Sequence, residues 1–315
     1  MRLIKCHCLI GLLLLCGFPS RGFAGEAQSA FKEGLKYQRA GKPKEAIAAY
    51  DKAIKADPKA AEPYVNRGTV YAKLGESERA VKDYDAAIKL DPKLTDAYFN
   101  RGNAYMDLKQ YERAVKDYEE ALRLNPKLPD GYVARGSAYL ADKKYEQAVK
   151  DYDVVIKQTP RSAKAHHRRG LAYLGLGQFG KAIDNFNQAQ KLNPKDPEIY
   201  SSRGLAHRRL GDRDLAVRDY SEAIKLDPKN AETYNNRGNV YSLLGKYDLA
   251  LKDYDQAIEV DGKNGRIYGN RGMVKLRLGK EEDAQKDFKK ALELDPGLKD
   301  KIGAVTGEQK APTKP

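Results

Sequence analysis

Residues 61–94 read AEPYVNRGTVYAKLGESERAVKDYDAAIKLDPKL, and residues 95–128 read TDAYFNRGNAYMDLKQYERAVKDYEEALRLNPKL. The two stretches have the same residue pattern. From residue 27 to residue 298 this pattern recurs with a fixed period, which is the length of one stretch. Three columns of the pattern hold glycine, alanine and proline: Gly34, Gly68, Gly102, Gly136, Gly170, Gly204, Gly238 and Gly272; Ala46, Ala80, Ala114, Ala148, Ala182, Ala216, Ala250 and Ala284; and Pro58, Pro92, Pro126, Pro160, Pro194, Pro228 and Pro296, with Gly262 in the remaining place. A fixed period of this length predicts stacked repeats that share a continuous core, instead of one large globular domain.

Each repeat is predicted to be a helix-turn-helix unit. In residues 61–94 we expect a first helix from Ala61 to Leu74, a turn around Gly75 and a second helix from Ser77 to Leu90. A residue before proline is disfavoured in the helical region, so Asp91 and Pro92 end the second helix. Charged residues are 32% of the chain and Trp is absent, which suits a thin fold in which every helix keeps one face in water.

Aromatic residues are expected to fill the space beside the small columns. One aromatic column is Tyr50, Tyr84, Tyr118, Tyr152, Phe186, Tyr220, Tyr254 and Phe288, a second includes Tyr71, Tyr105, Tyr139, Tyr173 and Tyr241, and a third includes Tyr64, Tyr98, Tyr132, Tyr200, Tyr234 and Tyr268. This order of tyrosine, glycine, tyrosine, alanine, aromatic, alanine and proline resembles the tetratricopeptide repeat (TPR) family. The resemblance covers eight repeats, at 27–60, 61–94, 95–128, 129–162, 163–196, 197–230, 231–264 and 265–298.

The resemblance implies an all-α fold: a right-handed α-α superhelix, or solenoid, of about eight helix-turn-helix repeats. First helices would line its concave groove, and the chain would serve as a scaffold that binds a protein or peptide there. Residues 299–315 would form a short cap, from Lys299 to Val305, and a disordered tail. Without a long capping helix, an exposed apolar edge would allow oligomers to form through the terminal repeats.

One column departs from the family's usual leucine. Arginine precedes the glycine in seven repeats, and an acid or amide stands at one constant separation after each arginine: Arg67, Arg101, Arg135, Arg169, Arg203, Arg237 and Arg271, then Asp83, Asp117, Asp151, Asn185, Asp219, Asp253 and Asp287. A buried charge without a partner is costly, so we predict an Arg–Asp pair that ties the two helices of each repeat together. In the alternative interpretation, the arginines form a ladder that binds phosphate.

Asparagines on the first helices are candidate peptide ligands. Asn66, Asn100, Asn236 and Asn270 stand directly before the arginine, and an amide can both donate to and accept from a peptide backbone. Ala134, Arg168 and Ser202 interrupt this ladder. Family members that grip the C-terminal carboxylates of heat-shock chaperones use a clamp that Lys164, Arg168 and Asn103 match in part. Phe99 and Ala134 replace other clamp residues, which argues against that chaperone role.

Charge is uneven along the expected groove. Asp96, Asp107 and Asp130 fall on the third and fourth repeats, while Lys164, Arg168, Arg208 and Arg209 fall on the fifth and sixth, with His167 beside them. A basic stretch of this kind can seat an acidic peptide segment, since guanidinium binds carboxylate in a bidentate manner. Ordinary solvated Lys and Arg side chains are the alternative interpretation.

Residues 1–24 have the layout of a secretory signal peptide. Arg2 and Lys5 precede the apolar run Leu9–Phe18, and small residues lead to an expected cleavage after Ala24. The protein would then be exported, to a periplasm or the outside. Alternatively the segment stays as a membrane anchor, or Cys16 is lipidated and the protein is a lipid-anchored assembly factor. Cys6, Cys8 and Cys16 all lie here, so the mature chain would contain no cysteine.

No metal site, cofactor site or catalytic group is expected. Few histidines exist, and the sequence has neither a Gly-rich phosphate loop nor a nucleophile with a matching base. The net charge of +14 falls to +11 without the signal cations Arg2, Lys5 and Arg21. A basic chain could bind an anionic polymer, either nucleic acid or cell-envelope polysaccharide. Nucleic acid is the less favoured partner, because Lys and Arg alternate with Asp and Glu along the helices.

Overall fold

The computed structural model describes residues 25–128 and 130–306, and all the regular structure in these ranges is helical. The chain divides into two compact units at Pro160 and Arg161. We call their described parts, up to residue 160 and from residue 161, the N-terminal and the C-terminal unit. The all-α fold class of stacked helix-turn-helix repeats is confirmed, and no described helix has both the length and the apolar character needed to cross a membrane.

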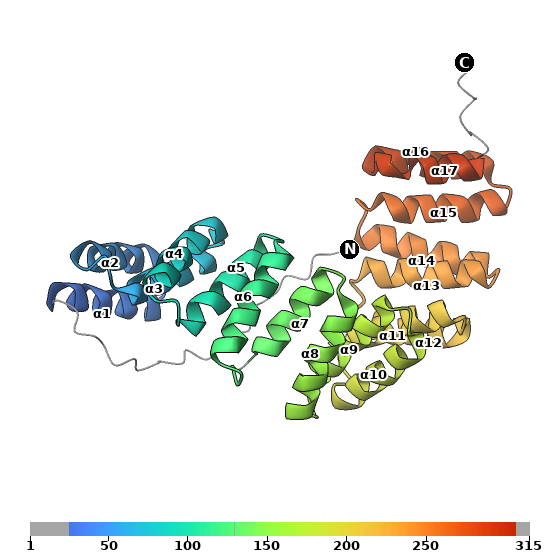
Figure 1. Cartoon of the computed structure of the whole chain (residues 1–315). Helices are drawn as coiled ribbons and strands as arrows, with labels where there is room; N and C mark the ends of the chain where they lie inside the picture. The colour runs from blue at the N-terminus through green and yellow to red at the C-terminus, as the bar shows by residue number, and fades with distance from the viewer. Residues whose placement is uncertain (1–24, 129, 307–315) are drawn as a thin grey trace, which may run out of the picture. The chain divides into compact units, whose positions relative to one another are not determined.

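The N-terminal unit consists of four helix pairs (Figure 1). Its helices are α1 (Gly25–Arg39), α2 (Pro43–Ala56), α3 (Ala61–Lys73), α4 (Ser77–Leu90), α5 (Thr95–Asp107), α6 (Tyr111–Leu124), α7 (Gly131–Ala141) and α8 (Tyr145–Gln158). Within the unit each second helix also packs against the first helix of the following pair, as α4 does against α5. The predicted bounds of the second repeat hold to within one residue, because α3 ends at Lys73 instead of Leu74.

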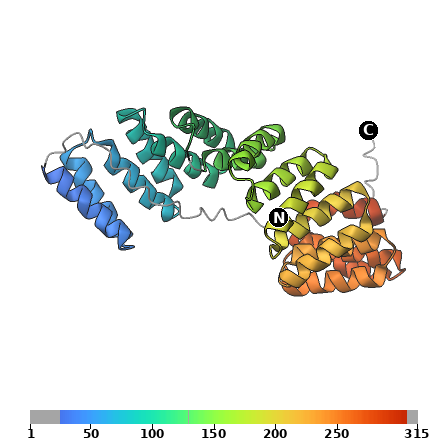
Figure 2. The ribbon, with the colours of Figure 1, turned by 90° about the horizontal axis from the view of Figure 1, so that it is seen from below.

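The C-terminal unit continues the same order, and Figure 2 shows its helix pairs from a second direction. Its helices are α9 (Ala163–Gly175), α10 (Phe179–Leu192), α11 (Pro197–Leu210), α12 (Arg213–Leu226), α13 (Ala231–Leu243), α14 (Tyr247–Val260), α15 (Gly265–Arg277), α16 (Glu281–Leu294), the 3₁₀ helix η1 (Pro296–Leu298) and α17 (Lys299–Thr306). On the short α17, Ile302 is buried against Phe288 and Ala291 of α16. The expected signal peptide (1–24) and most of the expected tail (307–315) lie outside the described residues.

The glycine column is a place of close approach between the two helices of a repeat. A Cβ added at Gly102 would lie 2.7 Å from Cε1 of Tyr118, a distance that requires the ring to move. Tyr118 itself is 1% exposed, and Ala114, one turn earlier on α6, is fully buried. Small residues on α5 and α6 therefore allow one aromatic ring to fill the space between the helices.

In four repeats the hydroxyl of the buried tyrosine has a partner in the column directly after the glycine, whereas Tyr50 donates to Gln38. Tyr118 donates to Asn103 Oδ1 at 2.7 Å and Tyr254 donates to Asn239 Oδ1 at 2.9 Å. Where that column holds Leu171 or Met273, the aromatic residue is phenylalanine instead: Phe186 and Phe288. In the repeat of Tyr220 the column after the glycine holds Leu205, which has no hydrogen-bonding side chain. The Tyr220 hydroxyl is buried without a hydrogen-bond partner among the described residues.

Candidate partner-binding surface

The arginine column is paired as predicted. In six repeats the arginine Nε and Nη2 donate to both carboxylate oxygens of the aspartate 16 residues later, at 2.6–2.9 Å: Arg67–Asp83, Arg101–Asp117, Arg135–Asp151, Arg203–Asp219, Arg237–Asp253 and Arg271–Asp287. The aspartates are 3–7% exposed. In the neutral variant, Arg169 Nε donates to Asn185 Oδ1 at 2.8 Å. Each pair joins the first helix of a repeat to its second helix.

The same arginines also reach the preceding repeat, which the sequence analysis missed. Arg101 Nη1 donates to Asp85 at 2.6 Å, and Arg271 Nη1 donates to Asp255 at the same distance. Arg67 pairs likewise with Asp51. Spacing alone could have shown this contact. Each of these aspartates stands 16 residues before its arginine, and the buried aspartate stands 16 residues after it. With three nitrogens donating to protein acceptors, these arginines link neighbouring repeats, which favours the structural role over a phosphate ladder.

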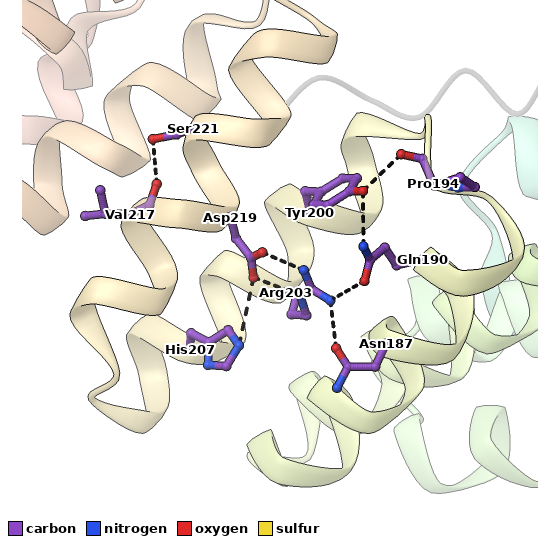
Figure 3. A network of polar contacts seen from close by, with 9 residues as sticks. All are labelled: Asn187, Gln190, Pro194, Tyr200, Arg203, His207, Val217, Asp219 and Ser221. Atoms are coloured by element: carbon purple, nitrogen blue, oxygen red, sulfur yellow. Dashed lines mark hydrogen bonds and ion pairs between the residues drawn. The ribbon is translucent and has the colours of Figure 1, made fainter.

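Arg203 has the most extended network of the column (Figure 3). Besides Asp219, its Nη1 donates to Asn187 and Gln190 on α10 at 2.7 and 2.8 Å. His207 Nε2 lies 3.9 Å from the Asp219 carboxylate. His207 is therefore part of this intramolecular network, and its other ring nitrogen, Nδ1, lies 3.4 Å from the Asp212 carboxylate.

Two of the four ladder asparagines donate to the protein itself. Asn66 Nδ2 donates to the Glu62 carbonyl and Asn270 Nδ2 donates to Asn235 Oδ1, both at 2.9 Å. Asn100 on α5 and Asn236 on α13 are partly buried, like the other two. Each amide retains a second N–H, so the asparagines can still bind a peptide, but Asn66 and Asn270 offer fewer free groups than the sequence indicated.

Asn103 and His167 are held by packing. Asn103 accepts the hydroxyl of the buried Tyr118, so it supports the core of its repeat. His167 was expected on the binding surface, but it is 7% exposed, its Nε2 lies 2.9 Å from Ser202 Oγ, and its ring lies 5.5 Å from that of Phe186. Burial, with a smaller effect of the Arg168 charge, lowers its pKa to about 4. His167 points from α9 toward α11 and not into solvent, which corrects the expectation.

The four predicted cations form two groups in the C-terminal unit. Lys164 and Arg168 lie one turn apart on α9, while Arg208 and Arg209 lie in the last turn of α11. The contact between His167 and Ser202 sets the register of the two helices. Arg208 is six residues beyond Ser202, or about 9 Å along the axis, so the two groups lie toward opposite ends of their helices. The predicted basic stretch is thus divided.

Three of these cations have no partner in the described part of the chain. Lys164 and Arg209 are exposed and Arg168 is partly buried, and no ion pair or hydrogen bond joins their side chains to another described residue. Arg208 differs, because its Nε is buried. Burial raises the pKa of the neighbouring Tyr220 hydroxyl, and the charge of Arg208 opposes part of that rise. Lys164, Arg168 and Arg209, which we call the free cations, are therefore the groups best placed to bind an anion.

The acidic residues expected on the groove belong to the N-terminal unit. Asp96 on α5 and Asp107 at the end of the same helix are exposed, and so is Asp130 directly before α7. Although both side chains reach water, partial desolvation of their carboxylates raises the pKa of Asp96 and Asp107, and a hydrogen bond from Ser77 opposes the rise at Asp107. No group of three or more His, Cys, Asp or Glu residues with the geometry of a metal site occurs among the described residues.

Comparisons with known proteins agree with this architecture. One family model, described as the tetratricopeptide repeat, matches residues 95–128, 163–196, 231–264 and 265–298. A second, described as the TPR repeat, matches residues 34–75, 70–109, 136–177 and 208–245. No curated protein matches the chain in sequence.

Solved structures of low sequence identity share the fold. A tetratricopeptide repeat protein from Parabacteroides merdae ATCC 43184 is 20% identical, with a TM-score of 0.63 over 79% of this chain and 98% of that one. The APC/C hetero-tetramer Cut9-Hcn1 is 16% identical, with a TM-score of 0.61 over 84% of this chain and 52% of that one. Because the family models match well over half of the sequence, in repeats that fold as helix-turn-helix pairs, the chain belongs to the tetratricopeptide repeat family.

Proposed function

We propose that this TPR protein is an exported scaffold that binds an acidic segment of a partner protein on the first helices of its C-terminal unit. The family's general role in protein–protein interaction supports the class of function. The observation that carries the proposal is the contrast between two kinds of cation. Six arginines of the core column are bound to aspartate, whereas the free cations Lys164, Arg168 and Arg209 have no ion pair with another described residue.

Physical chemistry favours an anionic occupant beside α9. Lys164 and Arg168 are four residues apart on one helix face, where like charges destabilise the helix by a few tenths of a kcal/mol. A carboxylate between them would remove that repulsion, and the guanidinium of Arg168 could donate two parallel hydrogen bonds to it. An acidic side chain or a C-terminal carboxylate of a partner meets this requirement.

Site-specific crosslinking tests the surface. A photoreactive amino acid at Arg168 should capture a partner in the compartment to which the protein is exported, while the same group at the exposed Lys191 on the second helix α10 should not. Changing the three free cations together to Glu should abolish the product of a crosslinker placed at Asn236. Equal capture at positions 168 and 191, or an unchanged product in the charge-reversed protein, would contradict the proposal.

An anionic polymer, nucleic acid or envelope polysaccharide, is the second candidate, since the same free cations could bind it. The two candidates differ in their salt response. Binding of a polyanion should fall linearly on a double-logarithmic plot against salt, because counterions are released from the polymer, and a bound peptide should be less sensitive. A steep linear slope, together with retention on DNA at physiological salt, would favour the polymer.

Export rests on residues 1–24 and has its own test. If the signal is cleaved after Ala24, mass spectrometry of the protein from its host should find a mature chain that begins at Gly25 and contains no cysteine. A chain that keeps its first residues would indicate a membrane anchor. A chain that begins with a lipid-modified Cys16 would indicate the lipid-anchored alternative.

A further inference from the structure

The C-terminal unit has a pocket that lies apart from the free cations. A pocket of about 330 Å³ opens between α12, α13 and α14, and its lining includes Tyr234, Arg237 and Tyr241 of α13 with Leu249 and Lys252 of α14. None of the free cations lines it. The pocket is large enough for one side chain of a partner, and it combines apolar walls with charged groups, as ligand sites commonly do.

The pocket lies where an apolar side chain, Leu249, replaces a cation that three other repeats place over the equivalent tyrosine. In the second repeat, Arg79 lies over the ring of Tyr71, 3.9 Å from its centre, and donates to the tyrosine hydroxyl at 2.6 Å. Arg113 and Lys181 cover the equivalent rings of α5 and α9. Leu249 stands at this position in the seventh repeat and is 44% exposed. It leaves the hydroxyl of Tyr241 without the cation that Tyr71 contacts.

The charge balance of the pocket also differs from that of equivalent places. Arg67, Arg101 and Arg271 each donate Nη1 to an aspartate of the preceding repeat. Arg237 donates Nη1 to the neutral Ser221 Oγ, at 2.9 Å, because serine replaces that aspartate. Lys252 adds a second positive charge and forms no ion pair or hydrogen bond within the described part of the chain. Asp253 is the one carboxylate that lines the pocket, so Arg237 and Lys252 leave a net charge of one positive unit.

We propose that this pocket binds the carboxylate side chain of a partner peptide. The carboxylate takes the role that aspartate has in the second, third and eighth repeats. It lies between Arg237 and Lys252, and an adjacent apolar residue of the peptide packs on Leu249 and Tyr241. A charge-assisted pair with arginine in a partly dry site is stronger than one between neutral groups. The site is independent of the surface proposed around Arg168, so either can fail without the other.

Two peptides that differ only in a side-chain carboxylate or amide test the proposal. The peptides Ac-Leu-Asp-Leu-NH₂ and Ac-Leu-Asn-Leu-NH₂ are titrated into the full chain, and the Nε–H resonance of Arg237 is followed by NMR. The acidic peptide should shift this resonance and bind roughly ten-fold more tightly than its amide analogue, which is the contribution of one charged hydrogen bond. Equal affinities, or an Arg237 signal that does not respond to the acidic peptide, would overturn the site.

A matched pair of variants locates the effect. Ser221→Asp restores the aspartate found in other repeats and should fold normally, but its own carboxylate occupies Arg237 and should weaken the acidic peptide by about ten-fold or more. Asn187→Asp makes the same kind of change beside Arg203, one repeat earlier, and should leave the affinity unaltered. If Ser221→Asp binds the acidic peptide as the natural protein does, the carboxylate does not bind at Arg237.

Discussion

Removing either partner of the Arg135–Asp151 pair alone should cost about as much stability as removing both partners together. Arg135 is the most suitable arginine of its column, because its hydrogen bonds within the described residues are the two to Asp151, at 2.9 and 2.7 Å. The side chains are 21% and 4% exposed, so either single change leaves a charge that water reaches poorly. Deleting one member of a buried pair costs about 3–5 kcal/mol.

The partial exposure of Arg135 places each single change at the lower limit of that range. Arg135→Leu, which introduces the family's usual residue, and Asp151→Ala should each cost about 3 kcal/mol. The double variant should also cost about 3 kcal/mol, because it leaves no buried charge, whereas independent effects would add to about 6 kcal/mol. The expected coupling energy is therefore about 3 kcal/mol, which is large for a pair of side chains.

Hydrogen exchange is the appropriate assay, since stacked repeats can open locally without global unfolding. The free energy of opening is measured for amides of α7 and α8 in the four proteins of the cycle. Lys157→Ala, at an exposed position of α8, controls for the loss of a charge and should change stability by less than about 0.5 kcal/mol. If the two single losses add to within about 0.5 kcal/mol, the pair does not tie the helices together.

Three further predictions follow from the core. Tyr254→Phe should lower the free energy of unfolding by about 1 kcal/mol, because it removes a buried hydrogen bond, while Tyr220→Phe should be neutral or stabilising; equal losses in urea titrations would contradict this. Burial lowers the pKa of His167 from 6.5 to about 4. The contribution of the neutral ring to the free energy of unfolding is therefore complete above pH 6.5, and it is lost, by up to about 3 kcal/mol, as the pH falls toward 4. His167→Gln should flatten this part of the plot of stability against pH. Gly180→Ala, where no atom lies within 4 Å of the added Cβ, should stabilise helix α10 by about 0.5–1 kcal/mol. Gly102→Ala, where the added Cβ meets the ring of Tyr118, should instead destabilise its repeat by about 1–3 kcal/mol. Thermal unfolding should therefore show changes of opposite sign for the two variants.

The sequence alone was sufficient for features that recur inside one repeat. The constant repeat length predicted the hairpins, with α4 correct at both ends and α3 wrong by one residue. The constant separation between arginine and aspartate predicted the Arg–Asp pairs. Such features are predictable because the two helices of a hairpin are close in the chain and adopt nearly the same geometry each time, so one residue pattern produces one contact.

The tertiary structure decided what happens between repeats. His167 looked like a surface residue on its own helix but is covered by α11, and Arg168 and Arg208 looked like one basic stretch but lie in separate groups. The spacing shows that serine replaces an aspartate at position 221, but only the packed chain shows that a pocket lies beside the resulting contact with Arg237. Burial and charge at these places depend on which side chain the neighbouring repeat supplies. A period describes what the repeats have in common, whereas binding sites arise where one repeat differs from the next.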